Sequence, residues 1–148
     1  ARSLSGTRLG HADGAGPAAQ TLVSKGSLSG RVVGIELSAE AIACAKENAK
    51  ANGVKAEYFV SKAEDFDWSG YAPDAVILDP PRAGLHPKSL EAVLANRPPL
   101  LVYVSCNFPK FLEEYKKLSA VYDLADARAL DLFPHTPHME CGFKLVRK

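Results

Sequence analysis

The chain has 148 residues, of which 47% are hydrophobic and 24% charged, and its formal net charge at pH 7 is +1. This length is typical of one domain with a sizeable core. No apolar run is long enough to cross a bilayer, and no signal-peptide segment is recognisable, so we expect no membrane partner. The near-neutral charge neither supports nor excludes a nucleic acid as partner.

Cysteine and histidine usage argues against a disulfide framework and against a metal site. The cysteines are Cys44, Cys106 and Cys141, an odd number without paired spacing. His135 and His138 are each preceded by a proline, which disfavours a helix that would present both side chains to a metal ion. The sequence therefore predicts no metal cofactor and a reducing, cytoplasmic setting.

The first 30 residues differ in composition from the rest. They are rich in Gly, Ser and Ala and hold no convincing strand, since Ser5–Gly10 has poor strand character. We expect residues 1–30 to be a poorly ordered or degraded segment. Residues 31–148 are expected to form the folded, catalytic domain.

From residue 31 onward, short apolar runs alternate with segments of helix-forming composition, which is typical of βαβ units and a mostly parallel sheet. Strands are predicted at Val32–Glu36, Tyr58–Val60, Ala75–Asp79 and Leu100–Val104. Helices are predicted at Ala39–Ala51 with Ser38 as N-cap and Asn52-Gly53 as the stop, at Lys88–Ala95, and from Pro109 to about Leu118. A last pair of strands is predicted at Leu124–Leu130 and Phe143–Val146. Strands that are apolar throughout fit burial on both faces.

Polar residues follow three of these strands. Glu36, Asp79 and the triplet Ser105-Cys106-Asn107 each stand at a carboxyl end. Ligands of parallel sheets bind beyond the carboxyl ends of the strands. Strand ends commonly carry polar residues, but this explanation is weaker for all three together than for any one. The coincidence favours an enzyme.

Glu36 lies between a strand and a helix, where an acidic residue commonly accepts hydrogen bonds from the ribose of a nucleotide. The alternative is a simple partner for the helix dipole. The usual companion is a glycine-rich loop after the preceding strand. Here the candidate is Asp13-Gly14-Ala15-Gly16, so Gly14 and Gly16 are candidate cofactor-binding residues.

A thiol and two carboxylates are the candidate catalytic groups. Cys106 is either an inert buried cysteine or a nucleophile placed before a helix, where backbone dipoles favour the thiolate. Asp79 is fixed by the two prolines that follow it. Glu140 follows the proline-stiffened segment 133–138, which suits a carboxylate that must be placed accurately, although an ordinary surface carboxylate is the alternative. Such a thiol and carboxylate suit addition to an electron-poor ring and later removal of a proton from it.

Three segments carry a resemblance to a known family: Asp79–Leu85, Tyr103–Asn107 and Asp131–Glu140. In their order and spacing they resemble the motifs of the S-adenosylmethionine-dependent RNA 5-methyluridine methyltransferases, over roughly residues 31–148. The resemblance implies an α/β, Rossmann-like class I methyltransferase fold, with a mostly parallel sheet and a C-terminal antiparallel strand pair. It also implies S-adenosyl-L-methionine as cofactor and tRNA or rRNA as partner.

The resemblance implies a role for each candidate residue. Cys106 would attack carbon 6 of uracil, which makes carbon 5 nucleophilic toward the methyl group of the cofactor. Glu140 would then remove the proton from carbon 5. Glu36 would bind the cofactor ribose, Asp79 would lie at the cofactor and the reacting centre, and the segment 62–65 would approach the adenine. The target base must leave its stack to react.

The chain departs from the family's pattern in several places. Phe108 replaces the usual proline after Ser-Cys-Asn, and we expect the family's first strand and glycine loop to be absent or badly degraded. No N-terminal RNA-binding region is recognisable, so we expect an incomplete N-terminal part that another domain or chain completes. The alternatives are an inactive remnant that serves as a binding module, or an enzyme for another base such as cytosine. The cytosine enzymes usually have Pro-Cys or Thr-Cys at the nucleophile, which fits less well.

Overall fold

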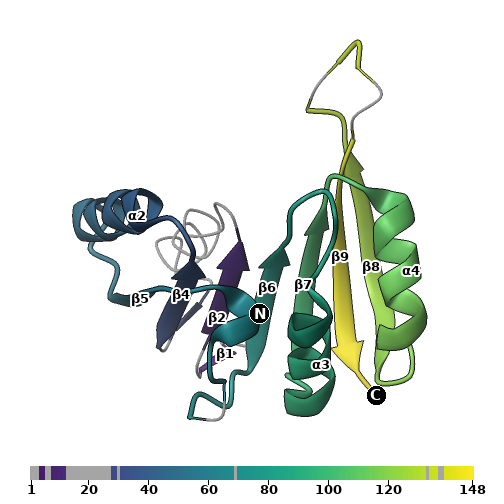
Figure 1. The fold of residues 1–148 in the computed structure, drawn as a ribbon, viewed down its shortest axis with the longest axis horizontal. Coiled ribbons are helices and arrows are strands. Elements are labelled where there is room, and N and C mark those ends of the chain that lie inside the picture. The colour runs from purple at the N-terminus through teal and green to yellow at the C-terminus, as the bar shows by residue number, and fades with distance from the viewer. Residues whose placement is uncertain are drawn as a thin grey trace.

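The computed structural model, shown in Figure 1, describes residues 4–5, 8–12, 28–29, 31–68, 70–132, 134–136 and 139–148. Its strands are β1 (Leu4–Ser5), β2 (Arg8–Ala12), β3 (Leu28–Ser29), β4 (Val32–Glu36), β5 (Ala56–Val60), β6 (Ala75–Asp79), β7 (Leu100–Ser105), β8 (Tyr122–Leu130) and β9 (Glu140–Arg147). Its helices are α2 (Ala39–Ala51), the short 3-10 helix η1 (Ala63–Asp65), α3 (Pro87–Asn96) and α4 (Phe108–Leu118). Every element predicted beyond residue 31 is present, with ends shifted by a few residues.

The main sheet has seven strands in the order β5-β4-β2-β6-β7-β9-β8. The five strands from β5 to β7 are parallel, and β9 pairs antiparallel with both β7 and β8. This confirms the predicted mostly parallel sheet with a C-terminal antiparallel pair. The strand order reverses at β2, because the chain passes first to β4 and β5 and then to β6 on the other side. Parallel sheets bind ligands at such a reversal.

The strand β2 corrects the prediction that residues 1–30 hold no strand and that the first strand is absent or degraded. Its residues Arg8–Ala12 lie between β4 and β6 at the middle of the sheet, with Ala12 opposite Asp79. The segment lacks the β-branched residues typical of strands. Because strand formation depends on cross-strand context more than on intrinsic preference, two apolar neighbours suffice to hold it. The loop candidate 13–16 lies outside the described residues and directly follows this central strand.

Helix α2 forms as its capping residues predict. Ser38 accepts a hydrogen bond from the Ala41 N–H through its side chain, at 3.2 Å, and Asn52 is the C-cap. Gly53 follows with φ of 65°, a left-handed conformation that glycine adopts without strain. Of the described helices, none combines the length and apolar character needed to cross a membrane.

Helix α4 packs its apolar face against β7 and β9. Phe111 stacks on Phe143 of β9, with ring centroids 3.6 Å apart, and meets Tyr103 of β7 edge-on. The burial of β7 alternates along the strand, so it is fully covered on one face only. The prediction of burial on both faces therefore holds for β4 and β6 but is wrong for β7 and for the edge strand β5.

The parallel strands all end at the upper edge of the sheet in Figure 1, where β9 begins. The last residues of β4 and β6 are Glu36 and Asp79, and Cys106 follows β7 directly. Glu140 is the first residue of β9. All four predicted side-chain candidates therefore lie along one edge.

The pairing of β7 with β9 holds the C-terminal strands in place at this edge. The buried residues of this pair allow a prediction about stability. Leu101 and Leu145 are directly opposite each other and 0% exposed. We expect Leu101→Ala to lower the free energy of unfolding by about 2–5 kcal/mol, because it leaves a cavity in the core. Urea denaturation measures this change. Leu124→Ala on β8, where the leucine is 43% exposed, should cost less than about 1 kcal/mol. Equal losses in the two variants would contradict the packing described here.

Candidate active site

The turn after β7 presents Cys106 at the sheet edge. The Asn107 N–H donates to the Ser105 hydroxyl at 3.0 Å, which closes the turn around the cysteine. The Asn107 side chain donates through Nδ2 to the Arg82 carbonyl at 2.9 Å. Cys106 is half-buried and stands directly before helix α4. The turn is therefore held both within itself and to the loop that follows β6.

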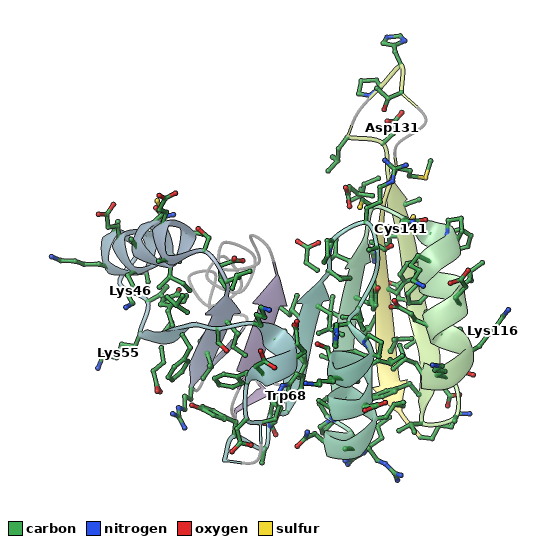
Figure 2. All side chains as sticks on the ribbon, viewed as in Figure 1. Lys46, Lys55, Trp68, Lys116, Asp131 and Cys141 are labelled. Carbon is green, nitrogen blue, oxygen red and sulfur yellow. The ribbon has the colours of Figure 1, made fainter. Side chains whose placement is uncertain are left out.

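The strand register brings Cys106 and Glu140 to the same end of the β7–β9 pair. Ser105 of β7 pairs with Cys141 of β9, which is the last pair at this edge. Cys106 directly follows Ser105 and Glu140 directly precedes Cys141, so both residues adjoin this pair. Glu140 also pairs with Leu130 of β8, where the β8–β9 hairpin leaves the sheet. Figure 2 shows Asp131 beyond the sheet edge and Cys141 at the upper end of β9.

Glu36 carries a carboxylate that is only half satisfied. Its Oε1 accepts a hydrogen bond from the Ser38 N–H at 2.8 Å. Its Oε2 is buried and has no hydrogen-bond partner among the described residues. A buried acceptor without a partner is costly, so an atom of this kind points to a ligand that donates to it. The vicinal hydroxyls of a ribose are donors of the required type.

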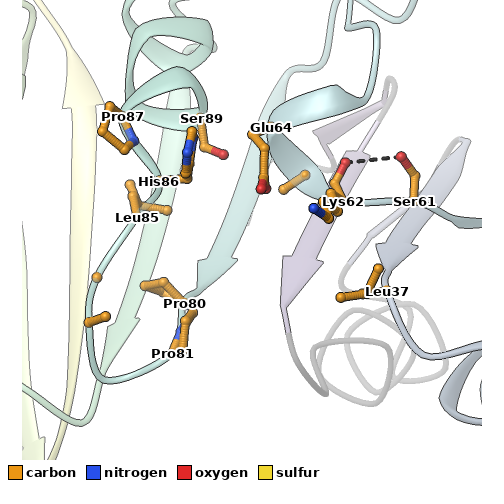
Figure 3. Close-up of a pocket in the computed structure, with 13 residues that line it drawn as sticks. Leu37, Ser61, Lys62, Glu64, Pro80, Pro81, Leu85, His86, Pro87 and Ser89 are labelled. Carbon is orange, nitrogen blue, oxygen red and sulfur yellow. Dashed lines mark hydrogen bonds between the residues drawn. The ribbon is translucent and has the colours of Figure 1, made fainter.

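A cavity of about 470 Å³ opens beside Leu37, the residue after Glu36, between the ends of β4, β5 and β6. Figure 3 shows its two walls: Leu37, Ser61, Lys62 and Glu64 on one side, and the loop after β6 with the start of α3 on the other. The described lining is largely apolar, with a few polar groups such as the buried Ser89. Such a pocket suits a flat heteroaromatic ring with polar edges.

Of the remaining predicted cofactor residues, Asp79 directly precedes Pro80 of the cavity wall, and the segment 62–65 adjoins the cavity. Asp79 is half-buried at the end of β6, opposite the last residue of β2. The segment 62–65 holds the 3-10 helix η1 and contributes to the cavity wall. Gly14 and Gly16 lie outside the described residues, in the loop that leaves β2. The strand order places the end of β2, which precedes them in the sequence, between the ends of β4 and β6.

The sequence reasoning missed a buried carboxylate behind the site. Glu114 of α4 is 6% exposed and accepts hydrogen bonds from the Tyr103 hydroxyl at 2.7 Å and from the Leu85 N–H at 2.9 Å. Burial, and next the hydrogen bond to Glu114, raises the pKa of Tyr103 above its ordinary value, so the hydroxyl keeps its proton at neutral pH. A signal was available: Phe111, Glu114 and Leu118 share one helix face, and the glutamate interrupts an otherwise apolar stripe.

The three cysteines differ in environment. Cys44 is exposed on α2, Cys106 is half-buried and Cys141 is buried, and all three are free thiols. Burial, followed by the neighbouring charge of Glu140, raises the pKa of Cys141. Cys141 is therefore part of the core, whereas the exposed Cys44 does not contribute to it. Within the part of the chain that the structure describes, no three His, Cys, Asp or Glu residues are placed to hold a metal ion.

Comparison with known proteins identifies related sequences. A family described as tRNA (Uracil-5-)-methyltransferase matches residues 19–148. The chain is 45% identical over 117 residues to a tRNA (uracil(54)-C(5))-methyltransferase of Pyrococcus furiosus, a match that covers 79% of this chain and 28% of that protein. It is 41% identical over 118 residues to a 23S rRNA (uracil(747)-C(5))-methyltransferase of Pyrococcus horikoshii, with 79% and 28% covered.

The chain is also similar to a solved structure of such an enzyme. The Pyrococcus abyssi tRNA (uracil-54, C5)-methyltransferase, crystallised in complex with S-adenosyl-L-homocysteine, superposes with a TM-score of 0.85 and 37% identity. The superposition covers 97% of this chain and 35% of that one. The chain therefore has the fold of a class I methyltransferase, as predicted, and spans about a third or less of the length of these relatives.

The environments of the cysteines predict an order of reactivity. With iodoacetamide at mildly alkaline pH, we expect Cys44 to be alkylated fastest, Cys106 more slowly and Cys141 slowest. The raised pKa of Cys141 leaves little thiolate at a given pH, so its rate should continue to rise above the ordinary thiol range. Peptide-resolved mass spectrometry measures the three rates in one sample. The packing of β9 would be contradicted by a Cys141 that reacts as fast as Cys44.

Proposed function

Because the chain belongs to the tRNA (uracil-5-)-methyltransferase family, we propose that it is the catalytic part of an enzyme that methylates carbon 5 of uridine in tRNA or rRNA. The observation that carries this proposal is that Cys106 and Glu140 both adjoin Ser105–Cys141, the last pair of β7 and β9, at one edge of the sheet. The cavity beside Leu37, the residue after Glu36, lies at the same sheet edge. A nucleophile, a base and a nucleotide-sized pocket are the parts that the reaction requires.

S-adenosyl-L-methionine is the proposed cofactor, and it would supply the methyl group from its sulfonium. The described residues fit its adenosine part: the unpaired Oε2 of Glu36 would accept from the ribose hydroxyls, and the cavity lined by segment 61–64 would take the adenine. Asp79 and the loop with Gly14 and Gly16 would hold the part near the methyl group. The complex of the P. abyssi enzyme with S-adenosyl-L-homocysteine supports this assignment.

The proposed chemistry assigns one step to each catalytic side chain. The Cys106 thiolate attacks carbon 6 of the uracil ring, and the electron pair of the 5,6 double bond moves toward the carbonyl oxygen at carbon 4. Carbon 5 thereby becomes nucleophilic enough to accept the methyl group. Glu140 then removes the proton from carbon 5, the double bond re-forms, and the bond between sulfur and carbon 6 breaks. Asp79 would orient the reacting groups.

RNA is the proposed partner, with the target uridine turned out of its stack into the edge beside Cys106. The curated relatives include enzymes named for tRNA and for 23S rRNA, so both classes of RNA remain possible substrates. Because the chain spans 28% of these relatives, we propose that a further domain or chain contributes to RNA binding. The free cysteines fit a cytoplasmic setting, where thiols stay reduced.

A second candidate is an inactive methyltransferase fold that acts as a binding or interaction module. The observation in its favour is a departure from the family's pattern, since Phe108 stands where a proline usually follows Ser-Cys-Asn. The presence of both Cys106 and Glu140 favours the enzyme. The two candidates differ in one measurable property, which is formation of a covalent bond to uracil.

Binding of the product cofactor tests the role of Glu36. We expect Glu36→Ala to weaken S-adenosyl-L-homocysteine binding at least tenfold, because it removes the acceptor for the ribose hydroxyls, and a charge-assisted hydrogen bond is worth about 1.5–3 kcal/mol. Isothermal titration calorimetry measures the affinity. Glu40→Ala, which removes an exposed carboxylate from the first turn of α2, is the matched control and should bind like the parent chain. Equal affinity of the Glu36 variant and the parent chain would remove Glu36 from the site.

Covalent trapping tests the catalytic pair. With an RNA that contains 5-fluorouridine and with S-adenosyl-L-methionine present, we expect a stable protein–RNA adduct, because fluorine cannot leave as a proton. Cys106→Ala should form no adduct, whereas Cys44→Ala should form as much as the parent chain. Denaturing gel electrophoresis and mass spectrometry of the cross-linked peptide measure the result.

The same assay separates the role of Glu140 from that of the nucleophile. With ordinary uridine RNA, Glu140→Gln should accumulate a methylated adduct, because attack by Cys106 remains possible but removal of the proton does not. Rapid turnover by this variant would exclude Glu140 as the base. A folded parent chain that traps no 5-fluorouridine RNA would favour the binding module over the enzyme.

A further inference from the structure

A buried carboxylate of α4, Glu114, supports the loop that follows β6, residues 80–85. Glu114 accepts the Leu85 N–H of this loop with Oε1 and the Tyr103 hydroxyl of β7 with Oε2. Both bonds are buried, and the glutamate is 6% exposed. One side chain of α4 thus joins the loop to the strand that leads to Cys106.

Gly84 shows how closely the loop approaches this carboxylate. Its φ is +87°, and a Cβ at this position would collide with Oε1 of Glu114 and with the side chain of Lys110. A larger residue would therefore be strained and would displace the carboxylate. The loop backbone lies directly against Glu114, and no intervening side chain can take up a change in its position.

The loop serves two parts of the site at once. Pro80, Pro81 and Leu85 line the cavity proposed for the cofactor. The Arg82 carbonyl of the same loop accepts the Asn107 side chain from the turn that carries Cys106. The loop is therefore a common wall between the cofactor pocket and the nucleophile, and its position affects both.

We propose that Glu114, together with Tyr103, is a positioning pair that sets the distance between the cofactor pocket and Cys106 by fixing this common wall. The inference rests on the proposed function for what the two sites bind, but the contacts themselves do not depend on it. Tyr103 acts as a dedicated donor, since its hydroxyl stays protonated. Neither residue needs to touch the substrate.

A pair of matched tyrosine variants tests this role. Tyr103→Phe removes the hydroxyl that donates to Glu114. Tyr122→Phe removes a hydroxyl that is also buried and that donates to the Pro98 carbonyl at 3.1 Å, at the opposite end of the sheet. Both changes delete one buried hydrogen bond from the core, so they should lower the melting temperature by similar amounts. A role limited to stability predicts the same behaviour for the two variants in every other assay.

The positioning role predicts different behaviour. With Tyr103→Phe, we expect the rate of Cys106 alkylation by iodoacetamide, relative to Cys44 in the same molecule, to rise about threefold or more, because the turn loses its fixed support. The dissociation constant for S-adenosyl-L-homocysteine should rise about threefold or more as well, a factor that corresponds to the lower range of a net hydrogen bond. With Tyr122→Phe, the relative alkylation rate and the dissociation constant should both stay within about 1.5-fold of the parent values.

A second comparison uses the carboxylate itself. The amide of Glu114→Gln can still accept from the Leu85 N–H and can donate to the Tyr103 oxygen. We therefore expect the relative alkylation rate of Cys106 and the dissociation constant for S-adenosyl-L-homocysteine to stay closer to the parent values in Glu114→Gln than in Glu114→Ala. Equal Cys106 alkylation ratios in Tyr103→Phe and Tyr122→Phe would overturn the proposal. If the parent chain binds no S-adenosyl-L-homocysteine, the cofactor assignment fails, and the alkylation ratio still decides the positioning role.

Discussion

The antiparallel pairing of β9 with β7 is the constraint on which the rest of the site depends. The parallel strands all deliver their carboxyl ends to one edge, and only an antiparallel strand can deliver its first residue to that same edge. The register of β9 is fixed by its core face, where Phe143 and Leu145 are buried while Lys144 between them is exposed. A slip by one residue would exchange these faces, so the packing of the core determines where Glu140 stands.

Most of the fold was predictable because its signals are local. The apolar runs of β4 and β6, the Ser38 cap and the Asn52-Gly53 stop each specify an element within a few residues. The central strand β2 was not predictable on these grounds. Its sequence Arg8–Ala12 has weak strand character, and its stability comes from pairing on both sides with strands distant in the sequence. Local patterns carry no information about such neighbours.

The residues of the candidate site were likewise predictable only in part. Glu36, Asp79 and Cys106 were predictable as candidates because each follows an apolar run, and strand ends in this architecture meet at one edge. The contacts that connect these positions were not. The bond from Asn107 to the Arg82 carbonyl, and those from Glu114 to Leu85 and Tyr103, join residues whose proximity depends on the finished packing. That the Oε2 of Glu36 has no partner among the described residues is likewise visible only in three dimensions.

Glu114 occupies a position that stability alone would assign to an apolar residue. Its neighbours on the buried face of α4 are Phe111 and Leu118, and a carboxylate among them must be desolvated. Two good hydrogen bonds offset that cost, but apolar groups of similar shape in place of both partners are often equally stable. Local rules of this kind are broken mainly at functional sites. What an apolar residue could not do is bind the Leu85 N–H, and with it fix the wall shared by the cavity and the cysteine. The placement of a polar group at this point in the core is therefore better explained by the geometry of the site than by the stability of the fold.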